Sequence, residues 1–507
     1  MSKRRIKRAL ISVYHKDGIK EIGGKLNLLG VEILSTGGTY DFFKDCGIPV
    51  KAVEEITSYP SILGGRVKTL HPKVFGGILG RRDNESDMKE MIEYNIPEID
   101  LVIVDLYPFE EYLKADATQE EIIEKIDIGG ISLIRAAAKN FRDTLIVSCK
   151  ELYPRLLDLL TAHSGETTLE VRKWFAGWAF NISSHYDSII FGYFNRNEDI
   201  HTFKSSLIEH RTLRYGENPH QKALFFGSKD NLPEQLHGKE ISYNNLLDIE
   251  AAIELISDFD ETTVAILKHN NACGCASGES VYDAWSAALK ADPVSAFGGI
   301  IISNREIDIA AAEDMDKIFF EVVIAPAYQE KALNILKQKK NRIILLNKTD
   351  LRSYEKFRSL LGGVLAQKRD DSIETTEALS VVTRKVASAE EVQDMIFANK
   401  VVKHSKSNAI VLVKDQILIA SGIGQTSRVD ALKQAIVKAE NFGFSLEGAV
   451  MASDAFFPFA DCVEIAHQAG ITAIIQPGGS IRDQESIEYC NQNNIAMVTT
   501  GVRHFKH

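Results

Sequence analysis

Two segments near the start of the chain contain the residue types needed to bind a phosphorylated small molecule and act on it. Residues 35–39 read Ser-Thr-Gly-Gly-Thr, and residues 66–72 read Arg-Val-Lys-Thr-Leu-His-Pro. The first segment offers hydroxyl donors and glycines that let the backbone approach an anion closely. The second is cationic and carries an imidazole beside a proline; its Arg66, together with Lys16, could make charge-assisted contacts with the same phosphate, although a solvated surface cation is the alternative for each. The pair predicts a phosphate site next to a reacting group, although an ordinary strand-to-helix turn is the alternative for residues 35–39.

A second group of candidate residues, Lys268-His269-Asn270-Asn271, lies about two hundred residues further along the chain. Residues 263–267 are apolar and predict a short buried strand, so Lys268 and His269 should stand at its end. A histidine beside a lysine can act as an acid–base pair, because the ammonium favours the neutral imidazole. A buried structural histidine is the alternative. The two groups together predict two active sites on one chain.

Composition sets the class of protein. At 507 residues, with 45% hydrophobic and 25% charged residues, the chain matches an ordinary soluble protein of more than one domain. A net charge of −11 argues against a nucleic-acid-binding surface. The apolar stretch after the basic residues at the start is too short for a secretion signal, and no run approaches the ~20 apolar residues of a membrane helix. Six cysteines without a disulfide framework favour the cytoplasm.

The elements expected to position the first group alternate along the chain. Short apolar runs at residues 8–13, 31–34, 99–104 and 145–148 predict buried strands. A helix is expected after Asp17-Gly18, to about residue 29, and another at residues 128–138. Strands that alternate with helices are typical of a parallel, doubly wound sheet. Ligands bind such sheets beyond the carboxyl ends of the strands, which is where Ser12, Ser35 and Thr36 should lie.

Further candidates for the first group stand at the ends of predicted elements. Tyr107 follows the strand at residues 99–104, so its phenol should reach the ligand edge of the sheet; a packing tyrosine is the alternative. Asp127 precedes the helix at residues 128–138, and Lys139 follows it. The alternatives here are a helix N-cap for Asp127 and a cation that matches the helix dipole for Lys139.

Polar and aromatic loops surround the second group. Residues 186–213 show no strong period, so we place a domain boundary near residue 200. Loops are expected at residues 214–221, 242–248 (ahead of a helix that starts at residue 249), 292–299, 405–408, 422–428, 453–461 and 503–505. Functional side chains beside glycine and proline in such numbers are typical of binding loops on a rigid scaffold.

Cys273 and Cys275 raise the question of a metal site. No further pair of cysteine or histidine residues stands at zinc-site spacing in the sequence. The His-x-Glu and Pro-Cys-x-x-Cys signature of zinc deaminases is also missing. The sequence therefore predicts no metal ligands.

The motifs RVKTLHP, DLYPF, DIGG, RAAAKN, RYGENPHQ, KHxN, DPVSAFGG and SDAFFPF occur in this order. Together they resemble the family of bifunctional purine-biosynthesis enzymes that combine AICAR transformylase with IMP cyclohydrolase, over nearly the whole chain. The resemblance implies an α/β fold in two regions. Residues 1–199 would form a methylglyoxal-synthase-like, doubly wound parallel sheet with the cyclohydrolase activity. Residues 200–507 would form two cytidine-deaminase-like α/β/α subdomains without zinc and carry the transformylase.

The resemblance also implies the residues of a cyclohydrolase site. Its phosphate contacts would be Ser12, Lys16, Ser35, Thr36, Gly37, Gly38, Thr39, Arg66 and Thr69. The residues around the reacting carboxamide and formyl groups would be Lys68, Tyr107, Asp127 and Lys139. Tyr14 and His15 stand where some relatives carry a small polar residue and aspartate, so neither is included.

For the transformylase site, the resemblance implies that His269 is the base that draws a proton from the amine of AICAR. Lys268 would keep His269 neutral, and Asn408 would orient the formyl group. The remaining contacts would be Arg214, Tyr215, Asn245, Phe297, Gly298, Arg428, Phe456, Asp461 and Arg503. Ala272 stands where many relatives have proline, a change that loosens the backbone but removes no functional group.

The implied ligands are AICAR, formyl-AICAR and IMP, with 10-formyltetrahydrofolate as co-substrate and no metal requirement. The family also implies a homodimer with active sites shared between chains, and large pockets do often form at subunit interfaces. No nucleic-acid or membrane partner is expected. Two rival interpretations remain: a transformylase whose N-terminal domain only senses phosphate, and a zinc deaminase.

Overall fold

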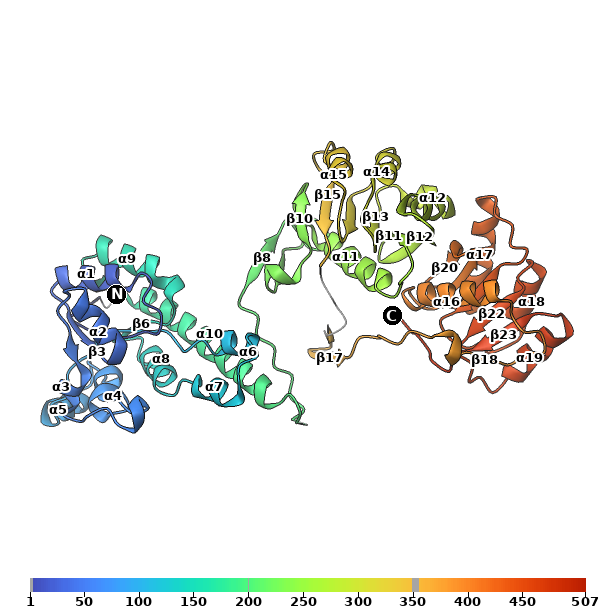
Figure 1. The fold of residues 1–507 in the computed structure, drawn as a ribbon. Coiled ribbons are helices and arrows are strands. Elements are labelled where there is room, and N and C mark those ends of the chain that lie inside the picture. The colour runs from blue at the N-terminus through green and yellow to red at the C-terminus, as the bar shows by residue number, and fades with distance from the viewer. Residues whose placement is uncertain (1–2, 199, 349–354) are drawn as a thin grey trace. The chain divides into compact units, whose positions relative to one another are not determined.

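The structure, a computed structural model, describes residues 3–198, 200–348 and 355–507. The chain forms two compact units, Met1–Ile208 and Glu209–His507 (Figure 1). The predicted boundary between residues 199 and 200 involves residue 199, which lies outside the described residues. The assignment of one activity to each region stays a prediction.

The first unit is built on a parallel sheet with the strand order β4-β3-β2-β5-β6. Its strands are β2 (Arg8–Ser12), β3 (Glu32–Ser35), β4 (Lys51–Ala52), β5 (Leu101–Val104) and β6 (Leu145–Val147), and β1 (Arg4–Arg5) pairs with β7 (Glu166–Thr167) beside it. Because β2 lies at the centre, the chain winds outward in both directions, which confirms the predicted doubly wound sheet. The predicted strands all form, with ends that shift by one or two residues.

Helices cover both faces of this sheet. They are α1 (Ile19–Leu28), α2 (Gly37–Asp45), α3 (Val53–Thr57), α4 (Pro72–Leu79), α5 (Glu85–Glu93), α6 (Phe109–Lys114), α7 (Gln119–Glu124), α8 (Gly129–Lys139), α9 (Tyr153–Ala162) and α10 (Leu169–Phe194). Alternate side chains of β2 pack on opposite faces of the sheet. Ala9 and Ile11 pack with α1 and α9, whereas Leu10 packs with α4 and α8. This alternation is the period of two expected for a strand buried on both sides.

Helix α10 corrects one sequence-based expectation. Residues 186–213 show no strong period in the sequence analysis, but α10 runs for 26 residues and ends within them, at Phe194. Tyr186, Ile189, Ile190 and Tyr193 share one face of the helix and belong to a small core with Phe109 and Ile122. Their spacing of three, four and seven residues is the helical period, so the sequence did carry the signal.

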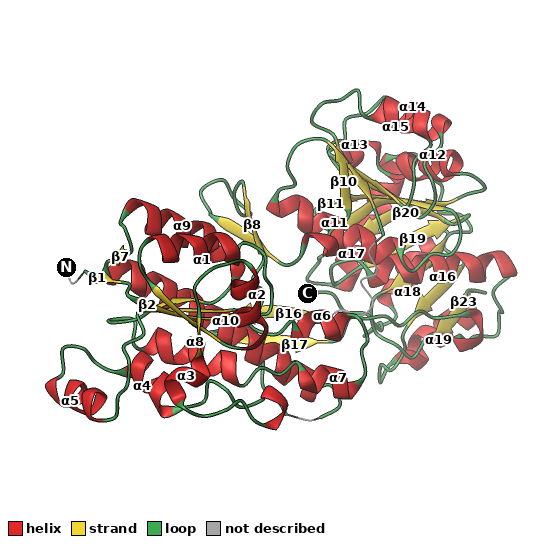
Figure 2. Ribbon diagram, turned by 60° about the vertical axis from the view of Figure 1, so that its left-hand side comes forward, coloured by secondary structure: helices red, strands yellow, loops and turns green. Residues whose placement is uncertain are grey.

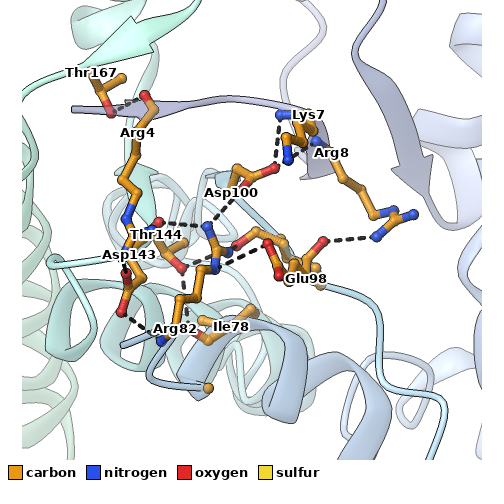
Figure 3. A network of polar contacts seen from close by, with 12 residues as sticks. Arg4, Lys7, Arg8, Ile78, Arg82, Glu98, Asp100, Asp143, Thr144 and Thr167 are labelled. Carbon is orange, nitrogen blue, oxygen red and sulfur yellow. Dashed lines mark hydrogen bonds and ion pairs between the residues drawn. The ribbon is translucent and has the colours of Figure 1, made fainter. Parts of the chain in front are cut away.

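A buried polar network ties together the amino-terminal ends of the strands (Figure 3). The Arg82 guanidinium donates to Asp100 Oδ1 at 2.5 Å and to the Asp143 carbonyl at 3.1 Å. Asp100 Oδ2 accepts from the backbone N–H groups of Lys7, at 2.8 Å, and Arg8, at 2.9 Å. Both side chains of the central pair are buried, with 6% and 4% exposed. The network therefore fixes the edge of the sheet opposite the expected ligand edge.

The second unit contains a sheet with the order β10-β15-β14-β13-β11-β12-β20-β19-β21-β22-β23-β18. Its strands are β10 (Glu234–His237), β11 (Thr263–Lys268), β12 (Asn271–Ser277), β13 (Ile300–Ser303), β14 (Val322–Ala325), β15 (Ile343–Leu346), β18 (Ser380–Val381), β19 (Ile410–Lys414), β20 (Ile417–Gly422), β21 (Val450–Ser453), β22 (Ala473–Gln476) and β23 (Ala496–Thr499). Two hairpins stand apart from it, β8 (His210–Leu213) with β9 (Ala223–Phe226) and β16 (Lys356–Leu360) with β17 (Gly363–Gln367).

This sheet consists of two halves with the same topology. Each half has an antiparallel hairpin (β11–β12 or β19–β20), then three parallel strands, then an antiparallel edge strand. The halves join where β12 pairs with β20, with Ala276 opposite Ile417. The arrangement agrees with the predicted pair of α/β/α subdomains.

Helices lie on both sides of the long sheet (Figure 2). They are α11 (Tyr243–Ile256), α12 (Val281–Ala291), α13 (Pro293–Ala296), α14 (Ile309–Met315), α15 (Glu330–Leu336), α16 (Ala389–Lys403), α17 (Arg428–Asn441), α18 (Asp461–Gln468) and α19 (Asp483–Gln492). Helices α11 and α16 share one apolar core on one face of the sheet. On the other face, each half has a core of its own.

Helix α11 begins earlier than predicted. It starts at Tyr243 instead of residue 249, and Ser242 and Asn245 form a capping box at its start. A serine followed three residues later by an amide side chain is a recognised start signal for a helix. As a result, Asn245 and Asp248 lie in the first turns of a helix and not in a loop.

Candidate active sites

A cavity of about 820 Å³ opens at the carboxyl edge of the first sheet. Its lining includes the predicted residues Ser12, Lys16, Thr36, Gly38, Thr39, Arg66, Lys68, Thr69, Tyr107 and Asp127. These residues come from segments far apart in the sequence and meet where parallel strands end. The cavity is large enough for a nucleotide-sized ligand.

The loop after β3 is fixed to the end of β2. Thr39 Oγ1 donates to the Val13 carbonyl at 2.9 Å and accepts from the Val13 N–H at 3.1 Å. Lys16 Nζ donates to Thr39 Oγ1 at 3.1 Å and also to the Val13 carbonyl. Burial lowers the pKa of Lys16, and the nearby Asp105 carboxylate opposes that effect. The loop thus holds a partly desolvated cation against the start of α2.

Gly37 allows a second cation to reach the same loop. Its φ of +54° lies in the left-handed region, and a Cβ at this position would lie 3.2 Å from Lys68 Nζ. Beside it, the Thr36 hydroxyl is buried and has no hydrogen-bond partner among the described residues. Two ammonium groups, a helix start and an unpaired hydroxyl around one loop are what an anionic group requires.

Two groups that can release a proton, Tyr107 and Asp127, also line the cavity. Asp127 Oδ1 accepts from the Gly130 N–H at 2.6 Å, so the aspartate, one residue before the N-cap Ile128, pairs with a backbone donor in the first turn of α8. Burial raises the pKa of Asp127, while backbone donors and Lys68 partly oppose this. Burial also raises the pKa of the Tyr107 phenol, as does the Asp127 carboxylate. Both groups hold a proton more firmly than usual, which suits proton transfer to a ligand.

Two predicted residues of the first site, Ser35 and Lys139, are placed differently, and a third, Arg66, is already paired. The Ser35 hydroxyl is buried and donates to the Ile11 carbonyl at 2.7 Å. Lys139 is exposed at the far end of α8, roughly 15 Å along the helix axis from Gly129, given the 1.5 Å rise per residue. Arg66 lines the cavity but pairs with Glu124.

Sequence reasoning left out several residues of this cavity, among them Tyr14, which it set aside, and Lys125. Tyr14 lines it, and its ring packs edge-on against Tyr107 with centroids 5.6 Å apart. Lys125 also lines it, with Nζ 5.6 Å from the Tyr14 ring and 5.9 Å from the Tyr107 ring. No sequence signal identified Lys125, because it lies in an irregular segment and reaches the site only through folding.

The second candidate site centres on the turn between β11 and β12. Lys268 pairs with Asn271 across the hairpin, so His269 and Asn270 form a two-residue turn. Both have positive φ, 52° and 64°, as the favoured hairpin turns require. Lys268 Nζ donates to the Phe297 carbonyl at 2.8 Å. The prediction that Lys268 and His269 stand at a strand end is confirmed.

This turn is connected to the segment that carries Asn408. The side chain of Asn271 donates to the His269 carbonyl at 2.8 Å and accepts from the Lys406 N–H at 3.0 Å. Asn408 donates to the Gln425 carbonyl at 3.0 Å. Residues from both halves of the sheet therefore meet near the seam where β12 pairs with β20.

Arg428 connects the residues that the second half of the sheet supplies to this site. Its Nη2 donates to Asn408 Oδ1 at 3.0 Å and to Asp454 Oδ1 at 2.8 Å, and its Nη1 donates to the Phe456 carbonyl at 3.3 Å. The Asp454 side chain is fully buried, and its carbonyl accepts from the His504 N–H at 3.2 Å. Asp454 and the C-terminal segment thus hold Arg428 and Asn408 in place.

The other predicted residues of the second site differ in exposure and in whether their side chains already have contacts within the chain. Arg214 stacks on Tyr215 at 5.1 Å, and Arg503 stacks on Phe505 at 4.3 Å. Arg214, Phe297, Phe456 and Arg503 are exposed, Gly298 has a positive φ of 75°, and Asp461 begins α18. Asn245 is buried, and its amide oxygen accepts from Ser242 Oγ at 2.9 Å. Its side chain is therefore already engaged in capping α11.

Comparison with known proteins decides the family. Residues 137–438 match the family described as AICARFT/IMPCHase bienzyme, and residues 18–132 match the MGS-like domain. A protein of Bacteroides thetaiotaomicron named "Bifunctional purine biosynthesis protein PurH" is 62% identical over 504 residues, 99% of each chain. The chain belongs to the AICARFT/IMPCHase bienzyme family.

Other members of the bienzyme family also align over almost their full length. The protein of the same name from Acetivibrio thermocellus is 50% identical over 519 residues, which cover 99% of this chain and all of that one. The one from Aquifex aeolicus is 48% identical over 510 residues with the same coverage. The family match supports an MGS-like fold for the first sheet.

The two cysteines that raised the question of a metal site are part of the core of this bienzyme. Cys273 and Cys275 lie in β12 and are buried, and burial raises the pKa of the Cys273 thiol to about 12. Among the described residues, no group of three or more His, Cys, Asp or Glu side chains could hold a metal ion. Within the same residues, no helix has the length and apolar character to cross a membrane.

Proposed function

We propose that the two candidate sites divide the two reactions of the bienzyme between them. As a member of this family, the protein is an AICAR transformylase and IMP cyclohydrolase. On this proposal, the site around His269 transfers the formyl group of 10-formyltetrahydrofolate to the 5-amine of AICAR. The cavity of the first unit then closes the ring of formyl-AICAR to IMP with loss of water. The observation that carries the proposal is that residues predicted for each site come together within one compact unit: ten line the cavity of the first unit, and in the second unit contacts join Lys268 to Phe297 and Arg428 to Asn408.

Formyl transfer requires a base because the amine of AICAR is a weak nucleophile whose lone pair is delocalised into the ring. His269, exposed at the tip of its turn, would remove a proton from the amine as it attacks the formyl carbon. Lys268 and Asn408 would stabilise the negative charge that develops on the formyl oxygen. Arg428, held by Asp454, would contact the nucleotide.

Ring closure takes place within one molecule, so correct positioning supplies much of the rate. Lys16 and the loop of residues 35–39 would bind the phosphate and thereby orient formyl-AICAR in the cavity. Tyr107 and Asp127, whose pKa values are both raised, would transfer protons during closure and loss of water. Lys68 has its Nζ near Gly37 and interacts electrostatically with the Asp127 carboxylate, so it can assist either phosphate binding or proton transfer.

A two-substrate assay on the intact protein tests the proposal. The protein should release tetrahydrofolate and form IMP when AICAR and 10-formyltetrahydrofolate are supplied, and it should also convert supplied formyl-AICAR to IMP. Transformylase activity without turnover of formyl-AICAR would instead leave the first unit as a phosphate-sensing domain.

Gly37→Ala should weaken IMP binding by about ten- to thirtyfold. Because the left-handed backbone costs alanine about 1–2 kcal/mol, the loop of the free variant should relax to another conformation and lose that free energy when it binds IMP. The new methyl group would also press on Lys68 Nζ. Isothermal titration with IMP measures the change. Gly47→Ala is the control, because Gly47 has a similar φ of +70° but nothing within 4 Å of the added Cβ. Equal affinities for the wild type and Gly37→Ala would show that the phosphate binds elsewhere.

The bienzyme is also proposed to be a cytoplasmic homodimer with shared transformylase sites, as the family resemblance implies. If the sites are shared, mixing His269→Ala chains with Arg503→Ala chains should restore part of the formyl transfer in heterodimers. Arg503 is preferred to Arg428 for this test, because Arg428→Ala would leave the buried Asp454 carboxylate unpaired. A fully active monomer in sedimentation at assay concentration would contradict the proposal.

A further inference from the structure

The two hairpin turns in the halves of the long sheet are built alike. In the first half the turn residues are His269 and Asn270, with φ of 52° and 64°. In the second half they are Asp415 and Gln416, both with φ of 55°. In each hairpin the strand register shifts at the same distance before the turn. The site around His269 therefore has a structural counterpart in the same chain.

An aspartate from the preceding helix holds each turn. Asp248 on α11 accepts from the Asn270 N–H at 2.7 Å. Asp394 on α16 accepts from the Asp415 N–H at 2.9 Å and the Gln416 N–H at 2.6 Å. Each aspartate is the sixth residue of its helix, so the interval from helix to turn is also the same. The repeated contact shows that this turn needs an acceptor for its outward-facing backbone donors.

The two turns differ in the side chain at their first position. In the first half this residue is His269, the proposed base, and in the second half it is Asp415, which no proposed step of the reaction uses. We infer that Asp248 is a positioning residue for formyl transfer, which fixes the His269 imidazole by holding the turn backbone. This inference rests on the proposed role of His269 as the base.

The charges around Asp248 agree with this role. Burial raises the pKa of Asp248, the Glu321 carboxylate adds to the rise, and the Asn270 N–H and His269 oppose it. Asp248 therefore interacts both with the turn backbone and with the imidazole itself. Since misplacement of a reacting group by about 1 Å can cost about 100-fold in rate, losing this contact should lower the rate of the chemical step.

The test compares Asp248→Ala with Asp394→Ala, its counterpart in the other half. Formyl transfer is measured as kcat and KM for AICAR, and turnover of supplied formyl-AICAR monitors the remainder of the protein. Asp248→Ala should lower kcat by about 100-fold with KM within about threefold. Asp394→Ala should leave kcat near the wild-type value. Asp248→Asn should recover most of the activity, because its amide oxygen can still accept from the Asn270 N–H.

A double variant shows whether Asp248 acts through His269. If it does, Asp248→Ala added to His269→Ala should cause no further loss of kcat. Where Asp248→Ala does not fold, Asp248→Ser serves, since its shorter side chain no longer reaches Asn270. Equal losses in Asp248→Ala and Asp394→Ala, or full additivity with His269→Ala, would overturn the inference alone. A fully active His269→Ala would overturn the proposed function and this inference together.

Discussion

His269→Ala should lower formyl transfer by about 100- to 10,000-fold, the range typical for loss of a general base. Cyclisation of supplied formyl-AICAR should continue at the wild-type rate, because the cavity that we assign to it lies in the other compact unit. The two rates, measured separately on one preparation, decide whether the activities are separable.

The control for this variant is His237→Ala, which removes an imidazole from the edge strand β10 of the same unit. It should leave both activities unchanged. If His269→Ala lost both activities while remaining folded, the assignment of one reaction to each site would be wrong.

Arg82→Ala should destabilise the first unit by about 3–5 kcal/mol, the usual cost of removing one partner from a buried ion pair. Among the described residues, the buried Asp100 carboxylate would then have only the backbone N–H groups of Lys7 and Arg8 as hydrogen-bond donors and no cation beside it. Urea unfolding followed by tryptophan fluorescence can detect this, since Trp174 and Trp178 lie on α10 of the first unit.

Arg81→Ala provides a neighbouring comparison. Arg81 also binds a carboxylate, that of Asp87, but its side chain is 66% exposed. Surface pairs of this kind contribute little to stability, so the unfolding midpoint should hardly move. The proposal for the Arg82 network fails if the two variants unfold at the same urea concentration.

Much of the first unit could be predicted from sequence because its signals are local. The strands at Arg8–Ser12 and Leu101–Val104 are short apolar runs that end in polar residues. In a parallel sheet the strand ends meet at one edge, so residues after different strands could be assigned to one cavity without knowing the fold in detail.

What the sequence did not reveal depends on contacts between distant segments. Lys125 joins the first cavity, and Asp454 pairs with Arg428, only because folding brings them there. Lys139 was assigned by resemblance to the site, yet within this chain it lies at the opposite end of α8 from the cavity. The two halves of the second unit repeat in their backbone geometry, which a sequence alone does not display. The start of helix α11 was predicted as a loop because its first turn is polar.

Each half of the long sheet is continuous in sequence, so a break in the connection between the halves would leave both of them intact. The connection between them carries the β16–β17 hairpin, whose tip at Leu361 is fully exposed. Exposed loop tips are the preferred sites of proteolytic nicking. A cut there would leave both fragments held by the core shared between α11 and α16 and by the ion pair of Lys438 with the buried Asp292 carboxylate. The C-terminal unit is thus suited to fragment complementation, in which two separately expressed pieces reassemble into one enzyme.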